Sequence, residues 1–383
     1  MNNTKKKIVI GIDAFFLFEK HNTGIGWLNY NIISQLAKLD QTNRYILYTP
    51  KINHHKGARE ILKNPNFIIK ETKGIFSGFR RIWLQSFKLK RNILMDNIDI
   101  FWGGGEYIPV LLPKKIVTLC TIHDLVFLLF PKTLSLTNRL FYFLLFPISL
   151  RRVDHFIAIS NDSAADIKNK LKINEDKITV IPNGINLDQF SFDPSIKKSD
   201  FILFVGTLQP RKNLENLIKA YILIHNRINT KLIVVGASGW KNSKIKSLVE
   251  SLSKTIRKNI EFKGYISNEE LVKLYRSARI FVAPSLHEGF GLIIAEAMAC
   301  GTPVITAPVG AIPEIFGDVP LYIDPLSPDD IASKIIHLLS NENLQKKMIR
   351  EGNELIQKYN INSVALKCKE LFEQIINKRG DVH

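Results

Sequence analysis

The sequence has few cysteines and no pattern of metal ligands. Its 383 residues include three cysteines, Cys120, Cys300 and Cys368, which stand far apart and form no CxxC pair or Cys/His cluster with metal-ligand spacing. A structural zinc site needs such clustering. We therefore expect a reducing compartment and no structural metal.

Long, uninterrupted apolar runs are also missing. The most apolar stretch, Leu125–Leu150, is broken by polar residues and prolines at Pro131, Lys132, Asn138, Arg139 and Pro147. A membrane-spanning helix needs about 20 predominantly apolar residues, and the apolar run that follows Lys7 is too short for a signal-peptide core. We expect a cytoplasmic protein, either free or peripheral on the inner face of the cytoplasmic membrane.

Acidic residues are scarce relative to basic ones. The chain has 53 Lys+Arg against 35 Asp+Glu, a formal net charge of +18, and residues 1–197 hold 28 of the basic residues against 16 acidic ones. Such a balance favours an anionic partner, which can be nucleic acid, a lipid surface or a phosphorylated substrate. No nucleic-acid recognition module accompanies the charge, so we expect no nucleic acid partner.

The sequence contains a repeated alternation of short apolar runs and helical stretches. Residues 7–12 predict a buried strand and residues 27–39 an amphipathic helix, and a second series starts at Phe201–Gly206 after the polar stretch Asp188–Asp200. Alternation of this kind is typical of a doubly wound parallel sheet. We predict an α/β protein with two Rossmann-like domains, residues 1–197 and 198–361.

The most informative segment lies between Glu288 and Glu296. The predicted helix after Gly289 is apolar nearly all round, and Glu296 is its only charge. A lone buried carboxylate needs a hydrogen-bond donor, and the two hydroxyls of a ribose are suitable donors. Glu288, eight residues earlier, suits the sugar end of a nucleotide-diphosphate sugar. The alternative is structural: Glu288 caps the helix and Glu296 pairs with a core Arg or Lys.

A second motif, GTLQPRKN, covers Gly206–Asn213 at the end of a predicted strand, where ligands of α/β sheets bind. Arg211 and Lys212 can hold a diphosphate there, bidentate from the arginine and as a point charge from the lysine. A cation pair exposed on the surface is the alternative.

The first half carries weaker signals. The loop Asn22–Gly26 presents Gly24 and Gly26 before a helix, but Asn29 stands where a dinucleotide fingerprint has its third glycine. Backbone amides and the helix dipole can bind an anion there, or the glycines can simply form a turn. His123 follows a predicted strand, and its pairing with Asp124 is on these grounds more typical of a structural network than of catalysis.

Taken in order, GID, TGIG, TIHD, VIPNGI, VGTLQPRKN, GYIS and E-x7-E resemble the retaining GT-B glycosyltransferases of family 4 over nearly the whole chain. The second half matches more specifically than the first. TGIG, TIHD and VGTLQPRKN look most like the GDP-mannose-dependent mannosyltransferases of bacterial surface-polysaccharide assembly. Trp27 departs from the family, which commonly has Arg after TGIG.

The resemblance implies a role for each matching residue. Arg211 and Lys212 would hold the leaving diphosphate, Glu296 the ribose and Glu288 the donor-sugar hydroxyls, with His123 beside the donor sugar. The remaining donor contacts would come largely from backbone, at Gly24, Gly26, Gly206, Tyr265, Ile266, Gly289, Phe290, Gly291 and Leu292. The resemblance also implies that the last helix, within residues 362–383, packs back on the first domain.

The implied reaction is transfer of a hexose, with mannose from GDP-mannose as the leading donor, to a lipid-linked or polysaccharide acceptor in O-antigen or capsule synthesis. Arg211 and Lys212 can stabilise the leaving group without metal, and no DxD motif is present. We therefore expect no metal and no cofactor besides the sugar-nucleotide co-substrate. The alternatives are a UDP-sugar-dependent glucosyl, galactosyl or N-acetylglucosaminyl transferase, an epimerase of UDP-N-acetylglucosamine, and an inactive partner subunit.

Residues Lys73–Arg91 contain six Lys/Arg and no acid. Phe79, Trp83 and Phe87 recur every four residues, which predicts one aromatic face of a helix. With the apolar Leu125–Leu150 region, this pattern predicts docking on an anionic membrane. An ordinary core-facing helix with solvated charges is the alternative.

Overall fold

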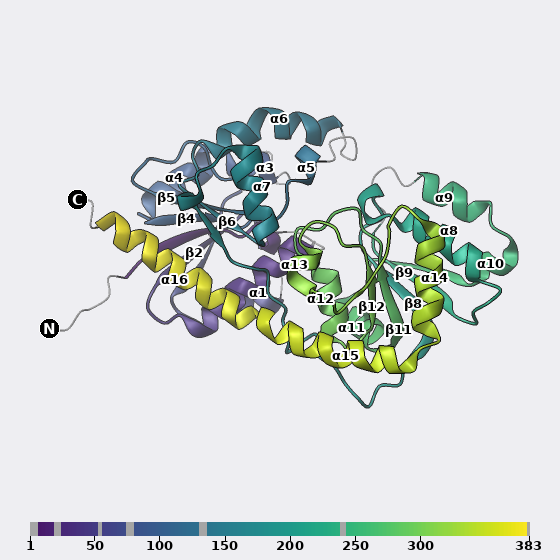
Figure 1. Cartoon of the computed structure of the whole chain (residues 1–383). Helices are drawn as coiled ribbons and strands as arrows, with labels where there is room; N and C mark the ends of the chain where they lie inside the picture. Colours follow the sequence, from purple (N-terminus) through teal and green to yellow (C-terminus); the bar gives the residue numbers. More distant parts are fainter. Residues whose placement is uncertain are drawn as a thin grey trace. The chain divides into compact units, whose positions relative to one another are not determined.

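The computed structural model describes residues 7–18, 24–52, 56–73, 80–129, 136–237 and 243–380. They divide into two compact units, each with its own parallel sheet and helices (Figure 1). Unit 1 comprises residues 1–125, 137–184 and 361–383, and unit 2 comprises residues 126–136 and 185–360. The α/β fold class predicted from the alternating pattern is confirmed.

Unit 1 is built on a seven-stranded sheet in the order β3-β2-β1-β4-β5-β6-β7, with every neighbouring pair parallel. The strands are β1 (Val9–Asp13), β2 (Arg44–Thr49), β3 (Phe67–Glu71), β4 (Ile100–Gly103), β5 (Val117–Ile122), β6 (His155–Ala158) and β7 (Ile178–Val180). The helices are α1 (Gly24–Leu39), α2 (Lys56–Ile61), α3 (Arg80–Leu84), α4 (Phe87–Met95), α6 (Leu136–Leu150), α7 (Asn161–Leu171) and α16 (Ile361–Gly380). The central strands are buried on both faces, which explains their continuous apolar runs.

Helix α16 belongs to unit 1 although it follows unit 2 in the chain, and it packs against α1 (Figure 1). Its buried residues Ile361, Val364, Ala365, Cys368, Leu371 and Phe372 join the same apolar core as β1 and α1. Lys369 adds an ion pair, 3.4 Å from the fully buried carboxylate of Asp40 at the end of α1. Asp40 also accepts hydrogen bonds from Thr42, Asn43 and Tyr45.

Unit 2 repeats the architecture with a six-stranded parallel sheet in the order β10-β9-β8-β11-β12-β13. The strands are β8 (Ser199–Val205), β9 (Lys231–Val235), β10 (Ile260–Gly264), β11 (Ala278–Ala283), β12 (Val304–Thr306) and β13 (Leu321–Tyr322). The helices are α5 (Val126–Leu129), α8 (Leu214–Ile224), α9 (Ser243–Glu250), α10 (Lys254–Lys258), α11 (Asn268–Ser277), α12 (Leu292–Ala299), α13 (Ile312–Phe316), α14 (Pro328–Leu339) and α15 (Glu342–Ile356). Strands β3, β7 and β13 were not anticipated from the sequence.

The polar stretch before β8 does not behave as a free linker, because it packs on unit 2. Arg276 Nε donates to the carbonyl oxygen of Ser191 over 2.7 Å, and the ring of Phe190 contacts that of Tyr275 with centroids 6.2 Å apart. The structure therefore assigns residues 185–197 to unit 2, whereas the sequence placed the boundary after residue 197.

The basic segment Lys73–Arg91 does not form one helix with a single aromatic face. Residues 74–79, and with them Phe79, lie outside the described residues. The helix breaks after α3, because Ser86 accepts from the amide of Leu89 and starts α4. Trp83 is buried and donates to the carbonyl of Thr72, whereas Phe87 is 78% exposed. The prediction that these two aromatic residues share a face is wrong.

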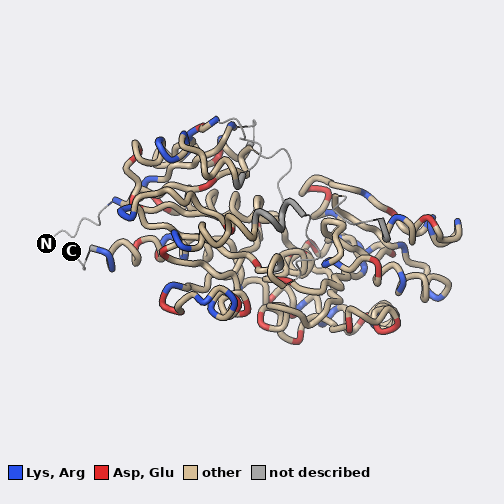
Figure 2. The backbone as a smooth tube through the Cα atoms, turned by 90° about the horizontal axis from the view of Figure 1, so that it is seen from above, with Lys and Arg blue, Asp and Glu red and all other residues tan. Residues whose placement is uncertain are grey.

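Among the described residues, no helix is both long enough and apolar enough to cross a membrane. Helix α6, the longest described element of the apolar region, has Pro147 within it. Lys and Arg occur along both units, mostly on segments at the periphery of the trace (Figure 2).

Candidate active site

Most of the predicted donor-binding residues of unit 2, apart from Tyr265 and Ile266, gather where the strand order reverses. Strands β8 and β11 are neighbours at the centre of the sheet, yet the chain leaves β8 toward β9 on one side and leaves β11 toward β12 on the other. In open α/β sheets, ligands bind beyond the carboxyl ends of the strands at such a switch point. The segment after β8 is the GTLQPRKN motif, residues 206–213, and the segment after β11 leads into the second motif, Glu288–Glu296.

Arg211, Lys212 and Glu288 form one compact charged cluster at this switch point. Lys212 Nζ lies 2.6 Å from Glu288 Oε1, and Arg211 Nη1 lies 3.2 Å from Oε2. Arg211 Nη1 also donates to the carbonyl oxygen of His287 over 2.5 Å, and Ser285 Oγ donates to Glu288 Oε1 over 2.6 Å. The three charged side chains are each 9–13% exposed, so the cluster is not a loose surface pair.

The cluster sets the protonation of Glu288. Burial alone would raise the pKa of this carboxyl group, but the positive charges of Lys212 and Arg211 and the hydrogen bonds from Lys212 and Ser285 outweigh it and lower the pKa to about 2. Glu288 is therefore ionised throughout the neutral range. Two cations and one carboxylate leave a single positive charge, which suits an anionic ligand.

Glu296 has a different environment from Glu288. It lies on α12, half-buried, and its Oε2 accepts a hydrogen bond of 3.0 Å from the hydroxyl of the fully buried Tyr275 on α11. Burial raises the pKa of Glu296 to about 7, although the Tyr275 hydrogen bond and the charge of Lys212 act in the opposite direction. Neither structural alternative is seen among the described residues. The N-cap residue of α12 is Gly291 and not Glu288, and Glu296 accepts from a tyrosine instead of pairing with an Arg or Lys.

The glycines of unit 2 allow the loops to approach closely. Gly236, with φ of +145°, follows β9, and a Cβ on it would lie 2.0 Å from the carbonyl oxygen of Gly206, which follows β8. Gly291 has φ of +91° and lets the chain enter α12. Gly289 and Phe290 are buried and Leu292 is half-buried at the first turn of α12.

Tyr265 and Ile266 follow the edge strand β10. Tyr265 is 46% exposed and Ile266 is half-buried, so backbone and side chains at this position are open to solvent. The sheet order places β9 and β8 between this edge and β11.

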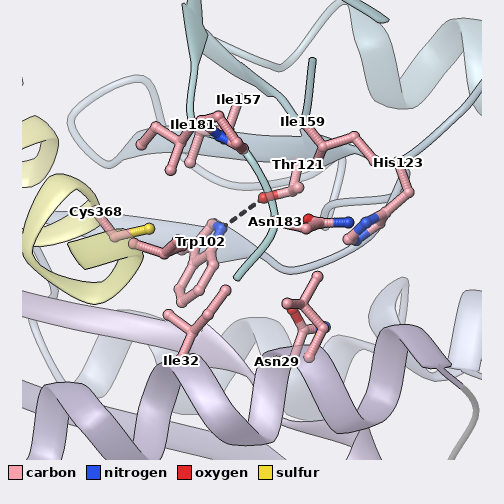
Figure 3. A pocket seen from close by; sticks show the side chains of 13 residues that line it. Asn29, Ile32, Trp102, Thr121, His123, Ile157, Ile159, Ile181, Asn183 and Cys368 are labelled. Carbon is pink, nitrogen blue, oxygen red and sulfur yellow. Dashed lines mark hydrogen bonds between the residues drawn. The ribbon is translucent and has the colours of Figure 1, made fainter. Parts of the chain in front are cut away.

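His123 lies in unit 1, in a small pocket beside the carboxyl ends of β4 and β5 (Figure 3). It is 5% exposed, and its Nε2 lies 3.0 Å from the carbonyl oxygen of Gly104. Asn29 of α1 donates to the same oxygen over 2.8 Å. Because a carbonyl only accepts, Nε2 carries a proton. Figure 3 shows Asn29, His123 and Asn183 on the side of the pocket away from Cys368.

Gly24 and Gly26 do not lie in a loop, as the sequence predicted, but in the first turn of α1. Asn22 and Thr23 lie outside the described residues. A Cβ on Gly24 would meet nothing within 4 Å, so there is open space beside the first turn of the helix. The dipole of the 16-residue helix α1 makes its N-terminus favourable for an anion.

Four polar contributors were not singled out for the site from the sequence. Tyr275 lies 21 residues before Glu296, and Ser285 lies three residues before Glu288. Asn183 belongs to the VIPNGI stretch, and Gly104 belongs to the Gly103–Gly105 run. Only Ser285 has a local signal, since a serine three residues from a buried carboxylate can reach it. The others become neighbours of the site residues through the fold.

Comparisons with known proteins bear on the class of this chain. GT-B proteins consist of two doubly wound units of this kind, and solved structures with that fold resemble this chain. Sucrose-phosphate synthase of Thermosynechococcus elongatus superposes with a TM-score of 0.77 at 21% identity, covering 97% of this chain and 100% of that chain. Anabaena HepE in complex with UDP and glucose superposes with a TM-score of 0.72 at 16% identity, covering 96% and 100%. Likenesses at this identity establish the fold.

The family follows from sequence. The model described as Glycosyltransferase Family 4 matches residues 23–189, and the model described as Glycosyl transferases group 1 matches residues 188–355. O-antigen chain mannosyltransferase B of Escherichia coli is 30% identical over 360 residues, covering 86% of this chain and 90% of the relative. This chain belongs to glycosyltransferase family 4 and is a glycosyltransferase.

Proposed function

We propose that this chain is a retaining hexosyltransferase that transfers mannose from GDP-mannose to a lipid-linked or polysaccharide acceptor in cell-surface glycan synthesis. The observation that carries the proposal is the cluster of Arg211, Lys212 and Glu288 at the switch point of unit 2, with Glu296 on the following helix. The mannosyltransferase relative of Escherichia coli supports mannose and an O-antigen acceptor.

The chemistry assigned to the cluster is stabilisation of the leaving group. When the bond between the anomeric carbon and the diphosphate breaks, negative charge grows on the diphosphate oxygens, and the charges of Arg211 and Lys212 would stabilise it. Both side chains are held by hydrogen bonds to Glu288. Glu288 holds both cations in place and accepts from donor-sugar hydroxyls. Glu296, as a carboxylate, accepts from the ribose hydroxyls. Backbone groups at Gly206, Tyr265, Ile266 and Gly289–Leu292 complete the donor contacts.

Unit 1 would supply the remaining contacts. The first turn of α1, with Gly24 and Gly26, favours the diphosphate through the helix dipole, and His123 would lie beside the donor sugar. The reaction would need no metal, since the two cations perform that role. Among the described residues, no three His, Cys, Asp or Glu side chains are grouped so as to hold a metal ion.

Three measurements test the proposal. A thermal-shift screen of GDP, UDP, ADP and their sugars should show the largest stabilisation with GDP and GDP-mannose. A larger stabilisation by UDP-sugars would show that the donor is a UDP-sugar and not GDP-mannose. UDP-sugars are the second candidate because HepE was solved in complex with UDP and glucose. NMR of the product should show that the anomeric configuration is retained, and inversion would reject the mechanism. Activity should persist in EDTA.

A further inference from the structure

Helix α6 has an exposed apolar face. Phe143 and Leu144 are 78% and 52% exposed, and Ile148, four residues after Leu144, is 49% exposed. Pro147, four residues after Phe143, is exposed as well. Residues four apart lie on the same side of a helix, so these four side chains form one surface. We call it the α6 face.

The opposite side of α6 is already used for packing. Phe146 and Ser149 are buried, the ring of Phe146 contacts that of Tyr107 with centroids 5.9 Å apart, and Ser149 Oγ accepts from the amide of Ile108 over 3.0 Å. Over residues 142–150, where the side chains of α6 are described, the helix is therefore apolar on both sides, and one of these sides lies against unit 1. Figure 1 shows α6 at the outer margin of unit 1. A contiguous exposed apolar surface of this kind marks an interaction site.

Cations adjoin the α6 face. Arg151 is exposed one residue after the helix ends, four residues beyond Pro147. The next residue, Arg152, donates to the carbonyl oxygens of Leu112, Pro113 and Ile116, which brings the exposed Lys114 and Lys115 beside the end of α6.

Acids are scarce beside these cations, and Glu106, just before the first of the two stretches that carry them, is half-buried. Residues 107–116 and 142–153 contain Lys114, Lys115, Arg151 and Arg152 and no Asp or Glu. The nearest acid after them in the chain, Asp154, is paired with Arg152 at 2.9 Å.

We propose that the α6 face, with Lys114, Lys115 and Arg151, docks on the surface of an anionic lipid bilayer. The apolar side chains enter the interface while the cations meet anionic headgroups, which is the arrangement of interfacial membrane-binding helices. A second copy of this chain fits less well, because pairing two α6 faces would bring like charges together. Docking here would bring the enzyme to a lipid-linked acceptor. Only this benefit rests on the proposed function; the docking surface itself does not.

The α6 face replaces the surface expected from the sequence. The aromatic helix predicted within Lys73–Arg91 is broken, and Trp83 is buried. That segment therefore does not present the single aromatic face on which its predicted membrane docking depended. The apolar contribution predicted from Leu125–Leu150 is retained in α6.

The test is flotation of the purified full-length protein with vesicles of phosphatidylcholine alone and of phosphatidylcholine with phosphatidylglycerol. Wild type should bind the anionic vesicles and lose binding as salt is added. Phe143→Gln with Ile148→Gln should lower the partition coefficient about tenfold or more for each side chain. Lys114→Gln, Lys115→Gln and Arg151→Gln should each lower it about fivefold.

Matched controls change exposed residues of the same kinds elsewhere. Leu223→Gln and Leu366→Gln replace leucines that are 52% and 43% exposed on α8 and α16, and Lys346→Gln with Lys347→Gln replaces exposed lysines of α15. These variants should bind vesicles as wild type does. The α6 variants should keep their thermal stabilisation by GDP, so that loss of docking and failure of the proposed donor are distinguished.

Three outcomes would overturn the inference. Wild type that does not bind anionic vesicles removes it outright. Equal losses in the control variants would show that the α6 face is not the docking surface. A wild-type dimer in light scattering that Phe143→Gln and Ile148→Gln convert to monomer would show that a second copy covers the face instead.

Discussion

Lys212 Nζ and Glu288 Oε1 lie 2.6 Å apart although the two residues are 76 positions apart in the chain. The contact joins the loop after β8 to the loop after β11, and Leu286 reinforces it by donating its amide to the carbonyl oxygen of Arg211 over 2.8 Å. The lysine is thereby oriented by the protein itself. A cation that needs no reorganisation is more effective at stabilising charge that develops in a transition state.

Removing this cation tests its assignment to the leaving group. Lys212→Met should lower kcat about 10²–10³-fold, because that is the typical effect of deleting one group that stabilises developing charge. Steady-state kinetics with GDP-mannose measure it. Lys219→Met on α8 is the control, since Lys219 is 44% exposed and pairs with Glu215 on its own helix. Equal effects of the two substitutions would remove Lys212 from the mechanism.

Glu288 should stabilise the fold in a pH-dependent way. Its pKa is about 2 in the folded state against 4.5 for an ordinary glutamate. A lowered folded-state pKa contributes stability that is present above pH 4.5 and is lost as the pH falls toward 2. The shift corresponds to roughly 3 kcal/mol.

Glu288→Gln should therefore lower the midpoint of thermal unfolding by about 5–10 °C at neutral pH. The difference from wild type should stay constant down to about pH 5 and shrink at lower pH. Calorimetry across this range measures it. A difference that grows as the pH falls would contradict the assigned ionisation.

Tyr275 should act as a positioning residue for Glu296. Its hydroxyl donates to the carboxylate and favours the charged form, so Tyr275→Phe should raise the pKa of Glu296 further above 7. If the carboxylate binds ribose, GDP affinity should increase as the pH rises through about 7 in wild type. In the variant the midpoint should move to higher pH, with affinity at pH 7 reduced about tenfold, the effect of one hydrogen bond to a charged group. Titration calorimetry over pH 6–9 measures both.

Tyr221→Phe provides the matched control. Tyr221 is equally buried in unit 2, and its hydroxyl donates to the backbone carbonyl of Thr230 over 2.8 Å. Both variants should lose some stability, but only Tyr275→Phe should shift the pH midpoint of GDP binding. An unchanged midpoint in Tyr275→Phe would reduce that residue to a structural role.

Two glycines at the ends of neighbouring strands should differ in their tolerance of a side chain. Gly236 and Gly264 both have positive φ, +145° and +67°, but a Cβ on Gly236 meets the Gly206 carbonyl oxygen at 2.0 Å and a Cβ on Gly264 meets nothing within 4 Å. Gly264→Ala should cost about 1–2 kcal/mol from backbone strain alone. Gly236→Ala adds an overpacking cost of about 1–3 kcal/mol. The free energy of unfolding, measured for both variants, should therefore fall more in Gly236→Ala than in Gly264→Ala.

The sheets could be predicted well from the sequence, because strands buried on both faces are continuous apolar runs. Strands β1, β5 and β8 therefore stand out, whereas β13 has only two residues and β3 has partly exposed side chains, so neither carries a clear pattern. The same limit applies to the domain boundary. Residues 185–197 are polar like a linker, and only their contacts with Arg276 and Tyr275 attach them to unit 2.

For the site, the sequence indicated the residue types but not their partners. The ion pairs of Glu288 join side chains 76 and 77 positions apart, and the Tyr275–Glu296 bond joins two helices. No local period encodes such contacts. The prediction that Trp83 and Phe87 share a face failed because Ser86 caps a new helix between them.

The position of α16 has a consequence for the order of synthesis. Residues 185–360 of unit 2 are complete on the ribosome before α16 emerges, whereas the core of unit 1 needs Ile361, Val364 and Phe372. Domains fold as their residues become available. Nascent unit 1 must therefore wait with one side of its core uncovered, and it closes only after the domain inserted into it has been made. A chain that stops before α16 would leave a finished unit 2 attached to an unfinished unit 1.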